Sequence, residues 1–125
     1  MNVLKTYYYI SAQYLKECLP YIPELKITNA KTYYGKIYVS NGKYIIALSK
    51  WNLDCGRIEW WDNEDFDLLI ETICHEFAHM FFWNHGEDHS RLTEDFKTLV
   101  KLSLEKHYLE NQLQQMYEED MKKVI

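Results

Sequence analysis

Two histidines, His75 and His79, enclose a glutamate in the pentad His-Glu-Phe-Ala-His. Residues four apart lie on one face of a helix, so the two imidazoles can converge on a single metal ion. The carboxylate of Glu76, one position from His75, can reach a metal-bound water without binding the metal itself. This is the arrangement that a metal-dependent hydrolase requires.

A third imidazole, His85, follows six residues after His79 in the segment Asn84-His85-Gly86. Glycine is the residue expected where a helix stops and the chain turns back. A chain reversal at this point would return the third imidazole toward the first two.

The pentad belongs to a helix that we expect over residues 63–83. Apolar side chains recur at helical spacing through Phe66, Ile73 and Phe77, and such a stripe buries one face and leaves the histidine face toward a cleft. Asp62 or Asn63 is a suitable cap for the start of this helix.

The first half of the chain predicts a sheet with a covering helix. A helix is expected over residues 7–19, ahead of Pro20, and a first strand over residues 25–30. Residues 31–40 and 43–49 are rich in β-branched and aromatic side chains and flank Asn41-Gly42, which predicts a tight antiparallel hairpin.

Two further segments flank the pentad helix. The connection over residues 51–62 contains Trp60-Trp61, which either closes the core or lines a cleft, and burial is the commoner role of such side chains. After Gly86 a helical pattern continues to the end of the chain, with residues 105–125 a polar helical extension.

Composition predicts a single globular domain over residues 1–125, because 47% of the residues are hydrophobic and 16% aromatic. The helices and strands expected above make its fold class α+β. The net charge of −5 does not predict the overall positive charge that favours binding to nucleic acid. Seven lysines among residues 1–50 keep a local basic surface open, so DNA binding is possible but not supported by charge.

The three cysteines and the absence of long apolar runs predict the compartment. Cys18, Cys55 and Cys74 are widely spaced and form no Cys-x-x-Cys pair, as in a protein of a reducing compartment. No run has the length of a signal peptide or a membrane span. We therefore expect an intracellular, cytoplasmic protein without a membrane partner.

The order of these elements resembles the SprT-like metallopeptidases, the family of the Spartan proteases. The specific matches are the strand Ile46-Ala47-Leu48-Ser49, the pentad, and His85-Gly86. The resemblance implies a minimal zincin fold, in which a three-stranded, antiparallel-type sheet with a hairpin packs against the pentad helix between N- and C-terminal helices. It also implies Zn²⁺ held by His75, His79 and His85, with Glu76 as the general base that hydrolyses peptide bonds of an intracellular protein.

Two features depart from the family pattern. The family usually has Phe or Trp four residues after the third ligand, whereas this chain has His89, so His89 is the alternative third ligand. We recognise no zinc ribbon or DNA-binding appendage of the kind that many relatives have, so we expect the family's link to repair of DNA-protein crosslinks to apply only weakly to this chain.

Other functions share parts of the pattern. The spacing His-x3-His-x5-His also occurs in YbeY-type endoribonucleases, which have Gly where this chain has Glu76. A non-catalytic binding module with structural zinc is a third possibility, and the ImmA-like peptidases share only the pentad. Candidates by residue type for an oxyanion donor are Tyr33, Tyr34, His107 and Tyr108, although each is more often structural.

Overall fold

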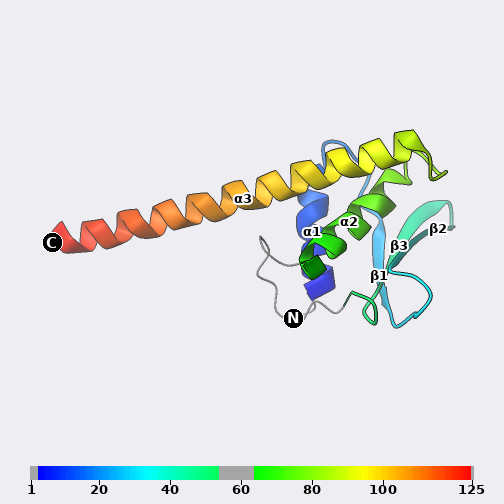
Figure 1. Cartoon of the computed structure of the whole chain (residues 1–125), viewed down its shortest axis with the longest axis horizontal. Coiled ribbons are helices and arrows are strands. Elements are labelled where there is room, and N and C mark those ends of the chain that lie inside the picture. The colour runs from blue at the N-terminus through cyan, green and yellow to red at the C-terminus, as the bar shows by residue number, and fades with distance from the viewer. Residues whose placement is uncertain (1–2, 54–63, 125) are drawn as a thin grey trace.

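The computed structural model describes residues 3–53 and 64–124, which form three helices and one sheet (Figure 1). In chain order the elements are α1 (Val3–Leu15), β1 (Glu24–Thr28), β2 (Gly35–Ser40), β3 (Lys43–Ser49), α2 (Glu64–Ala78) and α3 (Glu87–Val124). The predicted α+β class is confirmed. The predicted helix cap at Asp62 or Asn63 and the Trp60-Trp61 pair lie outside the described residues. None of the described helices is both long enough and apolar enough to cross a membrane.

The hairpin forms where the sequence predicts it. β2 and β3 pair antiparallel, with Ser40 opposite Lys43. Asn41 and Gly42 have φ angles of 51° and 77°, and both central residues of this tight turn need positive φ, which asparagine and glycine adopt most readily.

The sheet differs from the antiparallel type that we expected. Its strand order is β1-β3-β2, and β1 pairs parallel to β3, so the sheet is mixed. The hairpin places β3 between the other two strands, and residues Ile45–Ser49 are buried on both faces. The unbroken apolar run Ile45–Leu48 is typical of a central strand with a parallel neighbour, and this signal distinguishes β3 from a half-exposed hairpin strand.

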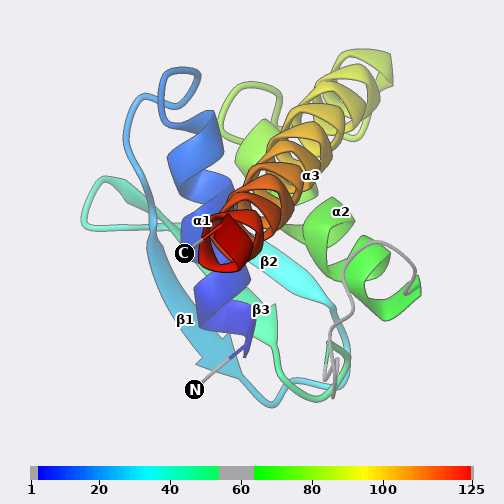
Figure 2. The ribbon, with the colours of Figure 1, turned by 90° about the vertical axis from the view of Figure 1, so that its left-hand side faces the viewer.

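Two helices lie on the sheet, and the third lies on those two helices. α1 contacts β1 and α2 contacts β2, and α3 packs across both helices (Figures 1 and 2). The largest fully buried side chains, which form the shared core, are Tyr8, Phe66, Phe77, Leu15, Ile46, Leu48, Leu53, Leu69, Ile70, Ile73 and Val100. Tyr8 is held in this core by a hydrogen bond from its hydroxyl to the carbonyl of Pro23, at 2.6 Å.

The helix boundaries differ from the predicted ones. α1 ends at Leu15 instead of residue 19, because the residue before Pro20 is disfavoured in helical conformation and residues 16–18 form a turn. α2 ends at Ala78 instead of residue 83, so His79 is the first residue of the following turn. The predicted polar helical extension is part of α3, which runs without interruption to Val124.

Charged side chains join α2 to α3 beside the core. The ammonium group of Lys97 lies 3.3 Å from the carboxylate of Asp67 and 3.8 Å from that of Glu71. Lys101 also bonds to Asp67, and these two lysines lower the pKa of the Asp67 carboxyl, the hydrogen bond to Lys101 being the largest cause.

We expect Asp67→Asn to lower the free energy of unfolding by about 0.5–1 kcal/mol at pH 7, the scale of a partly exposed ion-pair network. A carboxyl whose pKa is lowered in the folded state stabilises the protein above its unfolded pKa of about 3.9, and this contribution is lost as the pH falls through the folded value. Urea unfolding at several pH values measures the difference.

The matched control is Asp95→Asn, which removes an exposed carboxylate from α3. Its effect should stay small at every pH. An Asp67→Asn deficit that persists unchanged below the folded pKa would contradict an electrostatic origin.

Candidate metal centre

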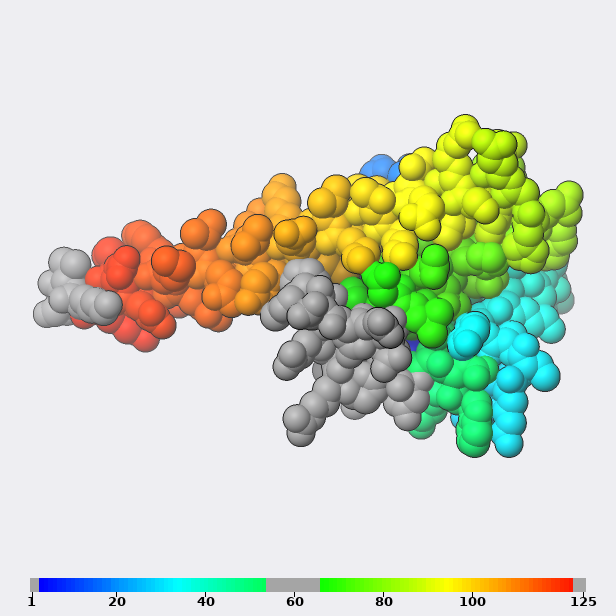
Figure 3. All heavy atoms as spheres, in the orientation of Figure 1, coloured from blue at the N-terminus to red at the C-terminus, as the bar shows by residue number. Residues whose placement is uncertain are grey.

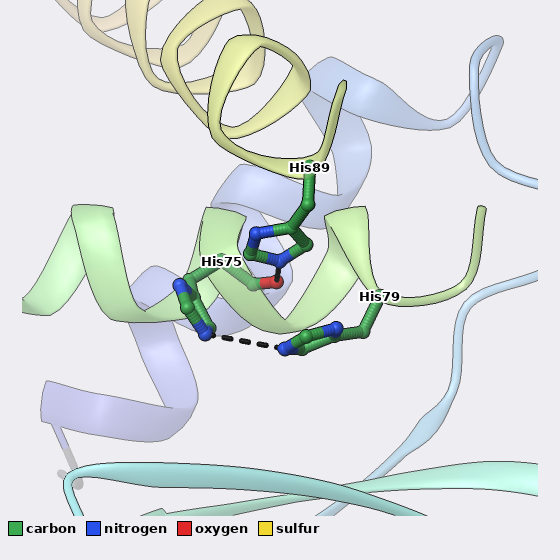
Figure 4. Close-up of side chains that lie close together, drawn as sticks. All are labelled: His75, His79 and His89. Carbon is green, nitrogen blue, oxygen red and sulfur yellow. Dashed lines mark hydrogen bonds between the residues drawn. The ribbon is translucent and has the colours of Figure 1, made fainter. Parts of the chain in front are cut away.

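The pentad histidines lie at the C-terminal end of α2. His75 is in the last turn of the helix, and the backbone N–H of His79 bonds to the carbonyls of both His75 and Glu76, at 3.3 and 3.2 Å. Shared bonds of this kind are common where a helix ends. The turn keeps both rings on one side, with their Nε2 atoms 3.2 Å apart (Figure 4).

His85 joins these two rings from the segment between α2 and α3. Its Nε2 lies 3.1 Å from Nε2 of His75 and 3.0 Å from Nε2 of His79. Three nitrogens bound to one tetrahedral zinc at 2.0–2.1 Å would lie about 3.3–3.4 Å apart. The observed triangle has nearly this size, so the residues fit a metal ion.

The hydrogen bond on the outer nitrogen of His79 determines which nitrogen carries its proton. Nδ1 of His79 lies 3.1 Å from the carbonyl oxygen of Phe82. A carbonyl only accepts, so Nδ1 donates and the neutral ring presents the lone pair of Nε2 to the triangle. A carbonyl on the outer nitrogen is the usual partner of a metal-binding imidazole.

His89 lies against the same cluster from the first turn of α3. Its ring is 2% exposed and stacks on the ring of His79, with centroids 4.0 Å apart and an interplanar angle of 27°. Ligand-capable atoms of His75, His79 and His89 lie within 4.8 Å of one another, so this group could also hold a metal ion (Figure 4). Both third-ligand candidates from the sequence are therefore present at the site.

The two candidates differ in the nitrogen that they can offer. Nε2 of His89 lies 3.0 Å from the backbone carbonyl of His75, and because a carbonyl only accepts, this nitrogen must carry a proton and donate. A protonated nitrogen has no lone pair for a metal, so His89 could bind only through Nδ1. Nε2 of His85, in contrast, faces the other two Nε2 atoms directly.

The surroundings keep the pentad histidines neutral. Burial, followed by the neighbouring imidazoles of His89, His79 and His85, lowers the pKa of His75 to about 4. Burial is also the main cause that lowers the pKa of His79. Neutral imidazole is the form that binds metal ions.

Glu76 is buried beside these rings, between α2 and β2. Its side chain is 5% exposed, and burial raises its pKa to about 7. A Cβ atom on Gly35, at the start of β2, would lie 3.3 Å from Cγ of Glu76 and 2.7 Å from Cγ2 of Thr72. Only glycine lets the strand approach the helix this closely.

A cleft of about 290 Å³ opens above the histidines and Glu76. One wall is the start of β2, formed by Gly35, Lys36 and Ile37. Trp83 lines the rim, with its ring 6.0 Å from that of His79 and stacked on Tyr44 at 6.3 Å. The cleft therefore combines a cluster of imidazoles, a buried carboxylate and an open strand edge.

Sequence reasoning missed the three residues Gly35, Lys36 and Trp83. A glycine inside a β-type run signals a close backbone approach, so Gly35 could have been found, whereas Lys36 and Trp83 carry no local signal. The oxyanion candidates Tyr33, Tyr34, His107 and Tyr108 are not among the described residues that line this cleft.

Cys74 is fully buried and burial raises its pKa to about 12, as expected of a core thiol.

Comparisons with known proteins identify no relative. No family model, no curated protein and no solved structure matches this chain. The geometry of the site is therefore the basis for any functional conclusion.

We expect Gly35→Ala to lower the free energy of unfolding by about 1–3 kcal/mol, the scale of overpacking in a closely packed interior. The added methyl group would lie 2.7 Å from Cγ2 of Thr72, so β2 or α2 must shift. Thr72→Ser removes that carbon, and the double variant should recover most of the loss in a double-mutant cycle.

Gly86→Ala is the matched control, because nothing lies within 4 Å of a Cβ atom at Gly86. Its loss should be the smaller one, at most about 1 kcal/mol, because the carbonyl of Gly86 accepts the first helical bond of α3 and alanine is less favourable than glycine at that position. Equal losses for Gly35→Ala and Gly86→Ala would show that the approach of β2 to α2 is not the constraint.

Proposed function

We propose that this chain is a zinc-dependent peptidase of the SprT-like type, built as a minimal zincin. His75, His79 and His85 bind the zinc, and Glu76 is the general base. The observation that carries this proposal is the triangle of three Nε2 atoms 3.0–3.2 Å apart, in the same cleft as the buried Glu76. A purely structural zinc site does not need that carboxylate.

In this proposal His89 positions the site and does not bind the metal. It donates a hydrogen bond to the carbonyl of His75 and stacks on His79. The ring of His89 also packs edge-on against the ring of His75, with centroids 4.4 Å apart. These ring contacts restrict both ligand rings, as partners beyond the ligands commonly do in metal sites.

The metal and Glu76 have separate roles in the proposed hydrolysis. His75, His79 and His85 would hold the zinc ion, which when bound would supply polarisation of the substrate carbonyl and a water molecule with its pKa lowered to about 7. The Glu76 carboxylate accepts the proton of the attacking water and passes it to the leaving amine. Its burial between α2 and β2 holds it at the floor of the cleft without a competing salt bridge among the described residues.

The substrate in this proposal is an extended segment of a protein. In the strand order β1-β3-β2, β2 has a free edge among the described strands, and its first residues line the cleft. An extended peptide can add to such an edge through main-chain hydrogen bonds. A peptide bound in this way would have a carbonyl near the histidines and a side chain near Trp83.

The ligand assignment predicts the metal content of five variants. Purified wild type should hold about one zinc per chain by mass spectrometry of the metal, as should His89→Ala and the distant control His107→Ala. His75→Ala, His79→Ala and His85→Ala should lose it, because three ligands are the minimum of a catalytic zinc site.

The reverse result at the third position, loss in His89→Ala and retention in His85→Ala, would move the ligand to His89. A wild-type protein that neither holds nor takes up a divalent metal would refute the proposed function.

We expect Glu76→Gln to separate zinc binding from catalysis. It should retain zinc and lose peptidase activity on an unfolded protein such as casein by about 10²- to 10⁴-fold, the usual contribution of a general base. Glu105→Gln, an exposed change on α3 away from the cleft, should retain activity. If zinc-loaded wild type cleaves RNA but not casein, the endoribonuclease alternative replaces the peptidase.

A further inference from the structure

The sheet face that carries the helices is left uncovered at the hairpin end by the described part of the chain. Ile37 and Val39 of β2 are two residues apart and therefore point to this same face. Ile37 pairs with Ile46 and is 9% exposed, whereas Val39 pairs with Tyr44 and is 57% exposed. The helices thus cover this face as far as Ile37 and leave Val39 open.

Trp83 lies beside this open end, in the segment between α2 and α3. Its ring stacks on the ring of Tyr44, with centroids 6.3 Å apart and an interplanar angle of 26°. The residue is 56% exposed, and Figures 1 and 3 show the segment next to the end of the hairpin. We call Val39, Tyr44 and Trp83 the apolar patch.

The apolar patch is continuous with the cleft of the candidate metal centre. Trp83 lines that cleft, and its ring lies 6.0 Å from the ring of His79. Ile37 also lines the cleft, and Val39 lies two residues, or about 7 Å, further along β2. A ligand that extends from the histidines toward the hairpin turn therefore passes over the patch.

We propose that the apolar patch binds a large apolar or aromatic side chain of the substrate, on the hairpin side of the peptide bond that is cleaved. This inference rests on the proposed peptidase function and names the substrates that the site prefers. An extended peptide added to the edge of β2 points alternate side chains to the two faces of the sheet. Every second side chain then faces α2, and the one beyond His79 meets Trp83 and Val39.

The chemistry of the patch favours an apolar side chain over a charged one. The acidic and basic side chains in the described lining of the cleft, besides the histidines, are Glu76 and Lys36. Glu76 is 5% exposed, and Lys36 is next to Ile37 in the strand, so it points to the opposite face of the sheet. A charged side chain at the patch would lose water without gaining a partner of opposite charge. An aromatic ring instead packs on the exposed indole of Trp83.

The cleavage sites in casein test the inference. Mass spectrometry of the peptides released by zinc-loaded wild type should show large apolar or aromatic residues at one fixed position beside the cleaved bond, several-fold above their frequency in casein. Trp83→Ala should lose this enrichment and keep its zinc. The matched control is Trp51→Ala, which removes an indole that is 61% exposed and is not among the described residues that line the cleft. This control should keep the enrichment.

Peptide binding provides a second readout that does not need turnover. Two peptides with the most frequently cleaved sequence, which carry Phe or Ala at the enriched position, are titrated calorimetrically into zinc-loaded Glu76→Gln. The Phe peptide should bind about tenfold more tightly than the Ala peptide. Adding Trp83→Ala or Val39→Glu should remove most of this difference, and adding Trp51→Ala should not.

Cleavage of casein without an enriched apolar position would overturn this inference and leave the proposed function intact. A preference that persists in both Trp83→Ala and Val39→Glu would overturn it as well, because another surface would then select the side chain. If Trp83→Ala lost its zinc, Val39→Glu would decide, since Val39 is not among the described residues that line the cleft. A wild type that binds no zinc and cleaves no casein would overturn the proposed function and this inference together.

Discussion

Three imidazole nitrogens that face one another at 3.0–3.2 Å are the constraint on which the site depends. Nε2 of His79 presents a lone pair, because its other nitrogen donates to the carbonyl of Phe82. Three such nitrogens cannot all hydrogen bond to one another when neutral, and burial opposes protonation of His75 and His79. A shared cation would relieve this conflict, so the cluster could hold a metal ion.

The surrounding elements act on this constraint in different ways. α2 supplies His75 and Glu76, and its early end at Ala78 turns the chain so that His79 and His85 meet His75. α3 returns over α2 and places His89 against the ligand rings. Gly35 allows β2 to approach Glu76, so a free strand edge lies along the cleft. The fold therefore brings a cluster of imidazoles and a buried carboxylate together with an open strand edge.

Much of this arrangement can be predicted from the sequence, because it depends on local residue patterns. The hairpin follows from Asn41-Gly42, and the convergence of His75 and His79 follows from helical spacing. What depends on tertiary contacts was not predictable. The parallel pairing of β1 with β3 arises from where the hairpin docks, and the relation of His85 to His89 depends on the path of residues 79–86. The predicted ends of the helices were also wrong, because helix propensity alone does not determine where α2 ends.

The most direct test of the metal centre is anomalous diffraction at the zinc edge from crystals of the purified protein. The account predicts one strong peak bonded to Nε2 of His75, His79 and His85, at about 2.0–2.1 Å from each, with His89 still donating to the carbonyl of His75. A peak bonded to Nδ1 of His89 in place of His85, or no peak in zinc-soaked crystals, would contradict it.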